Sequence, residues 1–317
     1  MHASCRRWRS CSNEHVRRPL WCAAFLSDFH CDRLVVIGVG LIGGSVAAAL
    51  RRAGKVRRIV GVGRGRANIE RALELRVIDE AIDDVALAVK GADIVLLAVP
   101  VRQNDRVLAQ LAPSLAAPTL VTDAGSTKGD FVAAIRRLLP AHLSHVVPAH
   151  PIAGAELTGV DAANAGLFVD RKVVLTPLPE NQAGAIDRIE SMWQACGAQV
   201  SRMACDRHDR VFSAVSHLPH MLAYALVHMI ATRPDARELF SFAAGGFRDF
   251  TRIAGSSPEM WRDIASANRE ALLADIASYQ QQLGQIAELI RNADTAQLGQ
   301  IFETARNARI AWPGRIS

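Results

Sequence analysis

The feature that most constrains the fold lies at residues 34–45, where an apolar run meets glycines spaced as G-x-G-x-x-G. An unbroken apolar run is typical of a strand buried on both faces. In that context Gly38 permits a tight turn, Gly40 leaves no side chain between the backbone and a pyrophosphate, and Gly43 lets the next helix pack close to the strand. Free N–H groups at the helix start would face the phosphates. The motif therefore predicts a bound dinucleotide, with Gly38, Gly40, Leu41, Ile42 and Gly43 in its site.

The end of the second predicted strand, at residues 58–62, bears on which dinucleotide is bound. An NAD enzyme usually places an acidic residue about 20 positions beyond the glycine loop. Here Arg64 and Arg66 follow the strand instead. Two guanidiniums can pair with a 2′-phosphate, so we predict NADP or NAD as the cofactor, with NADP favoured and Arg64 in its site. The alternative is that both arginines are solvated and NAD binds through the backbone.

Strand and helix patterns alternate up to residue 176, which predicts an α/β fold with a Rossmann-like, doubly wound, mostly parallel sheet over residues 31–204. Ligands of such sheets lie at the carboxyl ends of the strands. Pro100, Ser126 and His150 all fall there. The strands are expected at 34–37, 58–62, 92–99, 120–123, 145–149 and 172–176, and the helices at 46–52, 101–111 and 131–139.

From about Asp206 the pattern becomes helical, which predicts an all-α domain over residues 205–317. At the start of one helix Ser256 is a candidate cap, with Glu259 closing a capping box. Long apolar stripes that include Leu272 and Ile276 exceed what one thin layer would bury, so we expect this domain to form a homodimer. The helices are expected at 211–230, 234–242, 258–292 and 295–310.

Length and composition limit the classes of function. The 317 residues suggest two domains, and no stretch approaches the roughly 20 apolar residues of a membrane span. Half of the net charge of +6 lies in residues 1–30, so nucleic-acid binding has little support. We expect those 30 residues to be a disordered leader, because their apolar patch is too interrupted for a secretory signal. The cysteine spacing matches no zinc site, and the cytoplasm is the expected location.

Five segments in order carry a specific resemblance: G-V-G-L-I-G-G-S, D-A-G-S-T-K, H-P-I-A-G-A-E, S-H-L-P-H and G-G-F-R-D-F-T-R-I-A. Together they resemble the prephenate/arogenate (cyclohexadienyl) dehydrogenase family of tyrosine biosynthesis, from about Arg33 onward. The resemblance implies an oxidative decarboxylation. Hydride leaves ring carbon 4 of a cyclohexadienol for the nicotinamide, and carbon dioxide leaves ring carbon 1 as the ring becomes aromatic.

The reaction needs a base for the proton of the carbinol hydroxyl, and His150 at a strand end has a suitable ordinary pKa. Ser126 would bind the same hydroxyl and orient His150 or the nicotinamide. The alternatives are a structural histidine and a serine that caps the next helix.

The small-molecule substrate carries carboxylates, and the family resemblance gives Arg252 a pairing role that lysine could not copy. Arg248 would share its face on a helix, or would instead pair with Asp249. Ser213 and His217 lie four residues apart, on one helix face, and Pro219 should kink that helix. The resemblance implies that His217 contacts substrate, and Trp261 could wall the ring; a core histidine and a packed aromatic are the alternatives.

Several questions stay open in the sequence. Ala155 stands where many relatives keep a hydroxyl residue, so the choice between prephenate and arogenate is undecided. We expect tyrosine inhibition, if present, to act at the active site or the dimer interface. The alternative functions are a β-hydroxyacid dehydrogenase, which would normally carry a lysine on the 211–230 helix, and a non-catalytic nucleotide-binding protein. That helix has no lysine.

Overall fold

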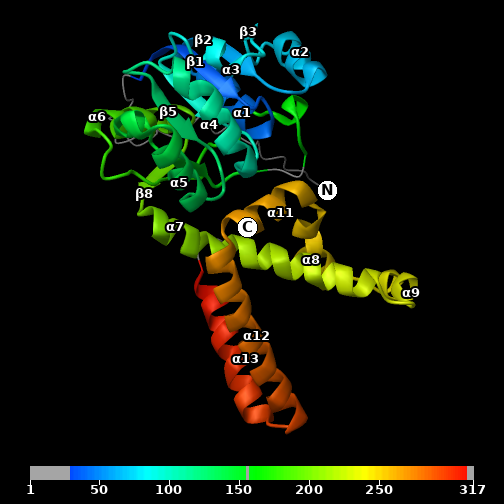
Figure 1. Cartoon of the computed structure of the whole chain (residues 1–317). Helices are drawn as coiled ribbons and strands as arrows, with labels where there is room; N and C mark the ends of the chain where they lie inside the picture. Colours follow the sequence, from blue (N-terminus) through cyan, green and yellow to red (C-terminus); the bar gives the residue numbers. More distant parts are fainter. Residues whose placement is uncertain (1–28, 155–156, 313–317) are drawn as a thin grey trace, which may run out of the picture.

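The computed structural model describes residues 29–154 and 157–312. Ala155, Glu156 and most of the predicted leader lie outside these residues. Phe29, which the predicted leader includes, is buried in the core. An α/β domain lies at the top of Figure 1, and two helical arms extend below and beside it.

The first sheet has five parallel strands in the order β3-β2-β1-β4-β5, as a Rossmann-like sheet requires. Alternate side chains of the central strand enter two different cores. Leu34 and Val36 pack with α1 and α6, whereas Val35 and Ile37 pack with α3, α4 and α5. Helices therefore cover both faces (Figure 1). The elements are β1 Cys31–Ile37, α1 Leu41–Arg52, β2 Val56–Val62, α2 Arg66–Glu74, β3 Glu80–Ala81, α3 Val85–Ala88, β4 Ile94–Leu97, α4 Asn104–Leu111, β5 Leu120–Asp123 and α5 Gly129–Leu138.

A second sheet of three strands follows, β6 Ala149–Pro151, β7 Lys172–Leu175 and β8 Gln199–Arg202, with α6 Ala183–Ala195 before the last strand. The sequence predicts one mostly parallel sheet, whereas the strands form two sheets, and β6 and β7 pair in antiparallel orientation. A parallel pair needs a crossover, usually a helix, and between these two strands the described residues form no helix beyond the 3-10 turn Val160–Ala162. α6 supplies that crossover between β7 and β8, which are parallel.

The rest of the described chain is helical, as predicted. α7 Cys205–Phe212 continues through a π-helical turn, Ser213–His217, into α8 Leu218–Ala231. The helix expected at 258–292 is divided in two by Asn268, whose side-chain amide donates to the Asp209 carbonyl at 2.8 Å. Its cap is Ser257 rather than Ser256, because the Ser257 hydroxyl accepts the Met260 N–H. The remaining helices are α9 Ala236–Ser241, α10 Gly245–Thr251, α11 Pro258–Ala267, α12 Arg269–Arg291 and α13 Thr295–Ala311.

The helices of this domain spread apart rather than closing around one core. α8 and α9 form one arm, and the antiparallel pair α12 and α13 forms the other (Figure 1). The run Cys205–Ala231 is long and apolar enough, with a mean hydropathy of 1.2, to meet a length and composition criterion for a membrane span. This departs from the expectation that no stretch approaches one. The criterion is weak evidence, because helices of soluble proteins also meet it.

Candidate active site

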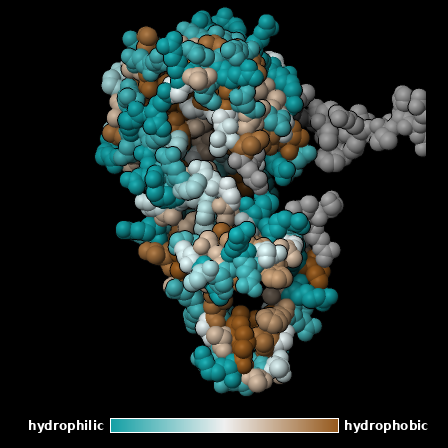
Figure 2. All heavy atoms as spheres, turned by 90° about the vertical axis from the view of Figure 1, so that its right-hand side faces the viewer, coloured by the Kyte–Doolittle hydropathy of each residue, from teal (hydrophilic) through white to brown (hydrophobic). Residues whose placement is uncertain are grey.

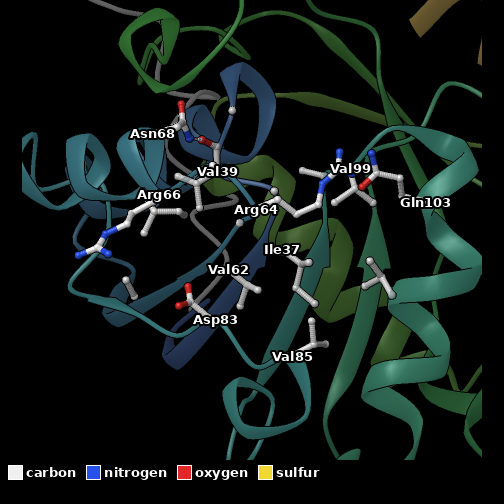
Figure 3. A pocket seen from close by; sticks show the side chains of 18 of the residues that line it. Ile37, Val39, Val62, Arg64, Arg66, Asn68, Asp83, Val85, Val99 and Gln103 are labelled. Carbon is white, nitrogen blue, oxygen red and sulfur yellow. Dashed lines mark hydrogen bonds between the residues drawn. The ribbon is translucent and has the colours of Figure 1, made fainter. Parts of the chain in front are cut away.

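A cavity of about 950 Å³ opens at the carboxyl ends of β1, β2 and β4 (Figure 3). Of the predicted cofactor residues, Gly38, Gly40, Arg64 and Pro100 line it. The predicted Leu41 and Ile42 are the first two residues of α1, whose N-terminus has no side-chain cap. The cavity therefore lies where the glycine loop meets an uncapped helix start, as expected for a site that binds phosphates.

The three glycines of the motif are needed for different reasons. Gly38 has a φ of +100°, and a Cβ there would lie 2.4 Å from the Ala98 carbonyl oxygen. A Cβ on Gly43 would lie 2.2 Å from the Gly38 carbonyl oxygen. Around Gly40, by contrast, no described atom lies within 4 Å of such a Cβ. The open space at Gly40 beside an uncapped helix fits a dinucleotide pyrophosphate.

The two arginines after β2 differ in direction. Both line the cavity, but Arg64 extends toward Val99 and Gln103, whereas Arg66 extends to the opposite side (Figure 3). The Arg66 guanidinium donates to Glu70 at 2.8 Å. The sequence places arginines rather than an acidic residue after β2, but two carboxylates from other segments, Glu70 and Asp83, also line the cavity.

His150 lies on β6, opposite Val174, and is buried. Its ring packs edge-on against Phe212 of α7, with 4.7 Å between ring centroids. Burial lowers the pKa of His150 well below the ordinary value, and the nearby charges of His208, Lys128 and His217 lower it further. The neutral imidazole, which is the form able to accept a proton, is therefore strongly favoured at this position.

Two residues that were not predicted from the sequence, His208 and Asp209, form a hydrogen-bonded series with His150. Its Nδ1 lies 2.9 Å from Nε2 of His208, and Nδ1 of His208 lies 2.8 Å from Oδ1 of Asp209. Asp209 also accepts the backbone N–H groups of Lys128 and Gly129, at 2.9 and 2.8 Å. A histidine and an aspartate adjacent in sequence, four residues before Phe212 and Ser213, were the available signal, since such spacing puts each pair on one helix face.

The loop with Ser126 is tied to the strand that carries His150. The buried Lys128 ammonium pairs with Asp123 and donates to the Ala149 carbonyl at 2.8 Å. Asp123 accepts the N–H groups of Gly125 and Ala149, at 2.8 and 3.0 Å. Ser126 is half-buried in this loop, between the two tied ends.

On the helical side, Ser213 and His217 of the π-helical turn and Trp261 of α11 are buried, and the centroids of the His217 and Trp261 rings lie 6.0 Å apart. The Ser213 hydroxyl, the His217 Nε2 and the Trp261 Nε1 have no hydrogen-bond partner among the described residues. Burial lowers the pKa of His217 to about 4, and its Nδ1 lies 3.1 Å from the Asn268 amide. Buried polar atoms are usually paired, so this cluster fits a polar ligand or water that would bind to it.

The two predicted substrate arginines lie differently. Arg252 begins the 3-10 turn Arg252–Gly255 after α10, and its charge is close enough to help lower the pKa of His220, after the larger effect of burial. The His220 ring stacks on Trp261, with 3.6 Å between centroids. Arg248 lies on the surface of α10 and pairs with Asp249 at 3.5 Å. The structure thus brings Arg252 toward the Trp261 cluster, whereas the recorded ion pair of Arg248 is with an exposed neighbour.

The elements that carry these residues meet where the two domains pack. α11, with Trp261, contacts the segment Val101–Gln103 that follows Pro100, and α7 contacts α5. Among the described residues no group of three or more histidine, cysteine, aspartate or glutamate side chains could hold a metal ion. The arrangement offers a dinucleotide cavity, a buried neutral imidazole and a set of unpaired donors.

Comparison with known proteins identifies the family. Residues 46–202 match the nucleotide-binding domain of prephenate dehydrogenase, and residues 204–304 match its dimerization domain. Cyclohexadienyl dehydrogenase of Zymomonas mobilis is 36% identical over 82% of this chain and 89% of its own length. Prephenate dehydrogenase of Bacillus subtilis is 36% identical over 83% of this chain and 71% of its own length.

Solved structures agree with this comparison. Prephenate dehydrogenase of Aquifex aeolicus, in complex with hydroxyphenyl propionate and NAD+, aligns with a TM-score of 0.83 at 34% identity, over 89% of this chain and 99% of its own. Synechocystis arogenate dehydrogenase aligns with a TM-score of 0.74 at 31% identity, over 87% of this chain and 98% of its own. The predicted fold class is confirmed, and the chain belongs to the prephenate dehydrogenase family.

Proposed function

We propose that this chain catalyses the oxidative decarboxylation of prephenate, arogenate or both, with hydride transfer to NAD(P). The products are 4-hydroxyphenylpyruvate from prephenate and tyrosine from arogenate. The observation that carries the proposal is the contact between His150 and Phe212, at 4.7 Å between rings, because it joins the strand that bears the base to the helix that bears Ser213 and His217.

His150 serves as the base in this proposal. Its imidazole accepts the proton of the hydroxyl on ring carbon 4 while hydride leaves that carbon. The nicotinamide, when bound, supplies the hydride acceptor. Loss of carbon dioxide from ring carbon 1 then makes the ring aromatic, and His150 returns the proton to the oxygen, so no net proton is released. Ser126 would hydrogen-bond the same oxygen from the neighbouring loop.

The remaining residues hold the substrate. Arg252 pairs with a substrate carboxylate, and Ser213 and His217 offer the unpaired atoms that its polar groups would meet. Trp261 walls the apolar ring. Arg248 differs from this set, because its side chain is 80% exposed and already paired with Asp249.

One experiment tests the function directly. The purified protein is mixed with prephenate or arogenate and with NAD or NADP, and reduced nicotinamide is followed by its near-ultraviolet absorbance. We expect turnover in at least one of the four combinations. Absence of reduced cofactor in all four would refute the proposal.

We propose further that NADP is preferred. Arg64 and Arg66 both line the cavity, but the guanidinium of Arg66 is paired with Glu70, which makes Arg64 the candidate partner of a 2′-phosphate. Asp83 acts against this preference by repelling a phosphate. Arg64→Ala should raise the KM for NADP more than that for NAD, and Arg66→Ala should change neither. A higher kcat/KM with NAD in the unmodified protein would contradict this assignment.

We propose that the helical domain forms a homodimer. Large apolar side chains on α12 and α13 are 46–61% exposed in the single chain, namely Leu273, Leu283, Ile290, Phe302 and Ile310. Figure 2 shows such residues gathered over the lower, helical half of the molecule. Exposed apolar area of this extent is typical of an interface. Light scattering should give the mass of two chains, with Ile290→Glu weakening association; a monomer at micromolar concentration would refute the proposal.

Two coarser assignments complete the proposal. We place the division between the nucleotide-binding and helical domains between Arg202, where β8 ends, and Cys205, where α7 begins. We place the protein in the cytoplasm, since the cysteines of its described part, Cys31, Cys196 and Cys205, form no disulfide.

A further inference from the structure

The carboxylate of Asp209 determines which ring nitrogen carries the proton in His208 and, through it, in His150. It is part-buried and accepts three hydrogen bonds, from His208 and from the backbone of Lys128 and Gly129. Burial acts to raise the pKa of Asp209, but these hydrogen bonds outweigh it and lower the pKa below the ordinary value. Asp209 is therefore ionised and can only accept hydrogen bonds.

The proton positions then follow along the chain of contacts. Because Asp209 only accepts, Nδ1 of His208 carries a proton and donates it at 2.8 Å. The Nε2 of a neutral His208 is then bare, so it accepts the Nδ1 proton of His150 at 2.9 Å. That leaves the Nε2 of His150 without a proton, as a base requires.

The surroundings of His150 make a positive charge on its own ring costly. Lys128 and His217 lie near it, and none of the hydrogen bonds recorded for its ring is with a carboxylate. His208 lies nearer to compensating charge, because Asp209 touches it and Asp123 also acts on it, against the positive charge of Lys128. A proton is therefore more stable on His208 than on His150.

We propose that His208 and Asp209 are positioning residues for His150, which hold its Nε2 bare and take up the positive charge while the substrate is deprotonated. When Nε2 of His150 accepts the hydroxyl proton, its Nδ1 proton passes to Nε2 of His208, and the charge rests on the ring beside Asp209. The same two transfers run backward when the proton returns to the product oxygen. The role of His208 and Asp209 during turnover rests on the proposed function. The positions of the protons in the resting protein do not.

The proton positions are tested on the unmodified protein. In protein labelled with 15N in its histidines, two-bond 15N–1H correlation spectra report which ring nitrogen carries the proton, with the His150 signals assigned by their loss in His150→Asn. We expect both His150 and His208 to be protonated at Nδ1. A proton on Nε2 of His150 would overturn the proposal, whether or not the protein turns over prephenate.

The role in turnover is tested by His208→Gln, whose side-chain oxygen can still accept the Nδ1 proton of His150 but cannot take up a proton. We expect kcat to fall by about 10-fold or more with little change in either KM, and the acid limb of the kcat/KM profile to move to lower pH. The matched control is His145→Gln, a histidine that bonds Ser144 at 2.8 Å, and it should keep the original profile. Unchanged kcat in His208→Gln, or a lower kcat with an unmoved acid limb, would overturn the role.

The two tests separate this inference from the proposed function. Protonation of both rings at Nδ1 without turnover of any substrate would refute the function and leave the assigned protons in place. Turnover of a substrate by a protein whose His150 is protonated at Nε2 would support the function and refute the assigned proton positions.

Discussion

The ammonium of Lys128 and the carboxylate of Asp123 form an ion pair from which water is excluded, with 0% and 1% of the two side chains exposed. Both partners also bond the backbone of Ala149, the residue before His150. The pair therefore connects the loop of Ser126 to the strand of His150. Its two charges compensate one another, so the loss of one partner leaves the other charge buried and unpaired.

Lys128→Met should destabilise the protein by about 3–5 kcal/mol, because Asp123 would stay buried without its counter-ion. The free energy of unfolding is measured by urea titration, with Lys90→Met, at an exposed lysine, as the control. A loss below about 1 kcal/mol would mean that the pair contributes no more than a surface ion pair.

Substitutions at two glycines of the loop should distinguish an effect on cofactor binding from an effect on stability. Gly40→Ala adds a methyl group into open space, so the melting temperature should stay the same while the KM for the cofactor rises. Gly43→Ala places a methyl group 2.2 Å from the Gly38 carbonyl oxygen, so it should cost about 1–3 kcal/mol of stability or more. Thermal unfolding and cofactor titration measure the two effects. An equal loss of stability in both variants would contradict this division.

The sequence predicts a site residue best when its role depends on residues close to it in the chain. The glycine loop is readable because turn, phosphate approach and helix packing all act within six residues, from Gly38 to Gly43. His150 can be recognised as a site residue because it stands at the end of a strand pattern. His208 and Asp209 share a helix face with Phe212 and Ser213, but this spacing does not reveal the contact of His208 with His150, which lies 58 residues earlier in the chain.

The second sheet and the break at Asn268 show the same limit. Strand patterns at β6 and β7 carry no sign of their relative direction, which depends on the connection between them, and the described part of that connection contains a single 3-10 turn. The apolar pattern of 258–292 continues through Asn268, and only the contacts of its side chain with Asp209 and His217 reveal why the helix divides there. Pro219 is expected to kink this helix, and the structure places it in the first turn of α8, directly after the π-helical turn Ser213–His217.

The low pKa of His217 predicts how stability depends on pH. Its side chain is 1% exposed, and burial lowers its pKa from 6.5 in the unfolded chain to about 4 in the native protein. Between these values the unfolded state binds more protons, so stability is full above pH 6.5 and falls as the pH drops toward 4. By pH 5 the loss from this group is roughly 2 kcal/mol. Urea titrations at pH 7.5 and 5 should show a smaller loss in His217→Gln; an equal loss would assign the effect to other groups.

Arg252 and Arg248 form a matched pair for testing the carboxylate contact. Arg252→Ala should raise the substrate KM by about 10- to 100-fold, the equivalent of roughly 1.5–3 kcal/mol for a hydrogen bond to a charged group. Arg248→Ala should change the same KM less than about twofold, because its exposed pair with Asp249 contributes little. Steady-state kinetics at saturating cofactor measure both. The reverse order of effects would transfer the role to Arg248.

His150→Asn removes the base but keeps a polar side chain in the buried position, so the fold and both binding sites should persist. We expect kcat to fall by about 10²- to 10⁴-fold, the usual contribution of general-base catalysis, with little change in the substrate KM. Because the pKa of His150 lies well below its ordinary value, the unmodified enzyme should keep its kcat/KM down to pH values below 6.5. The variant should lose that acid limb, since no imidazole remains to be protonated. A kcat close to that of the unmodified enzyme would show that another group accepts the proton.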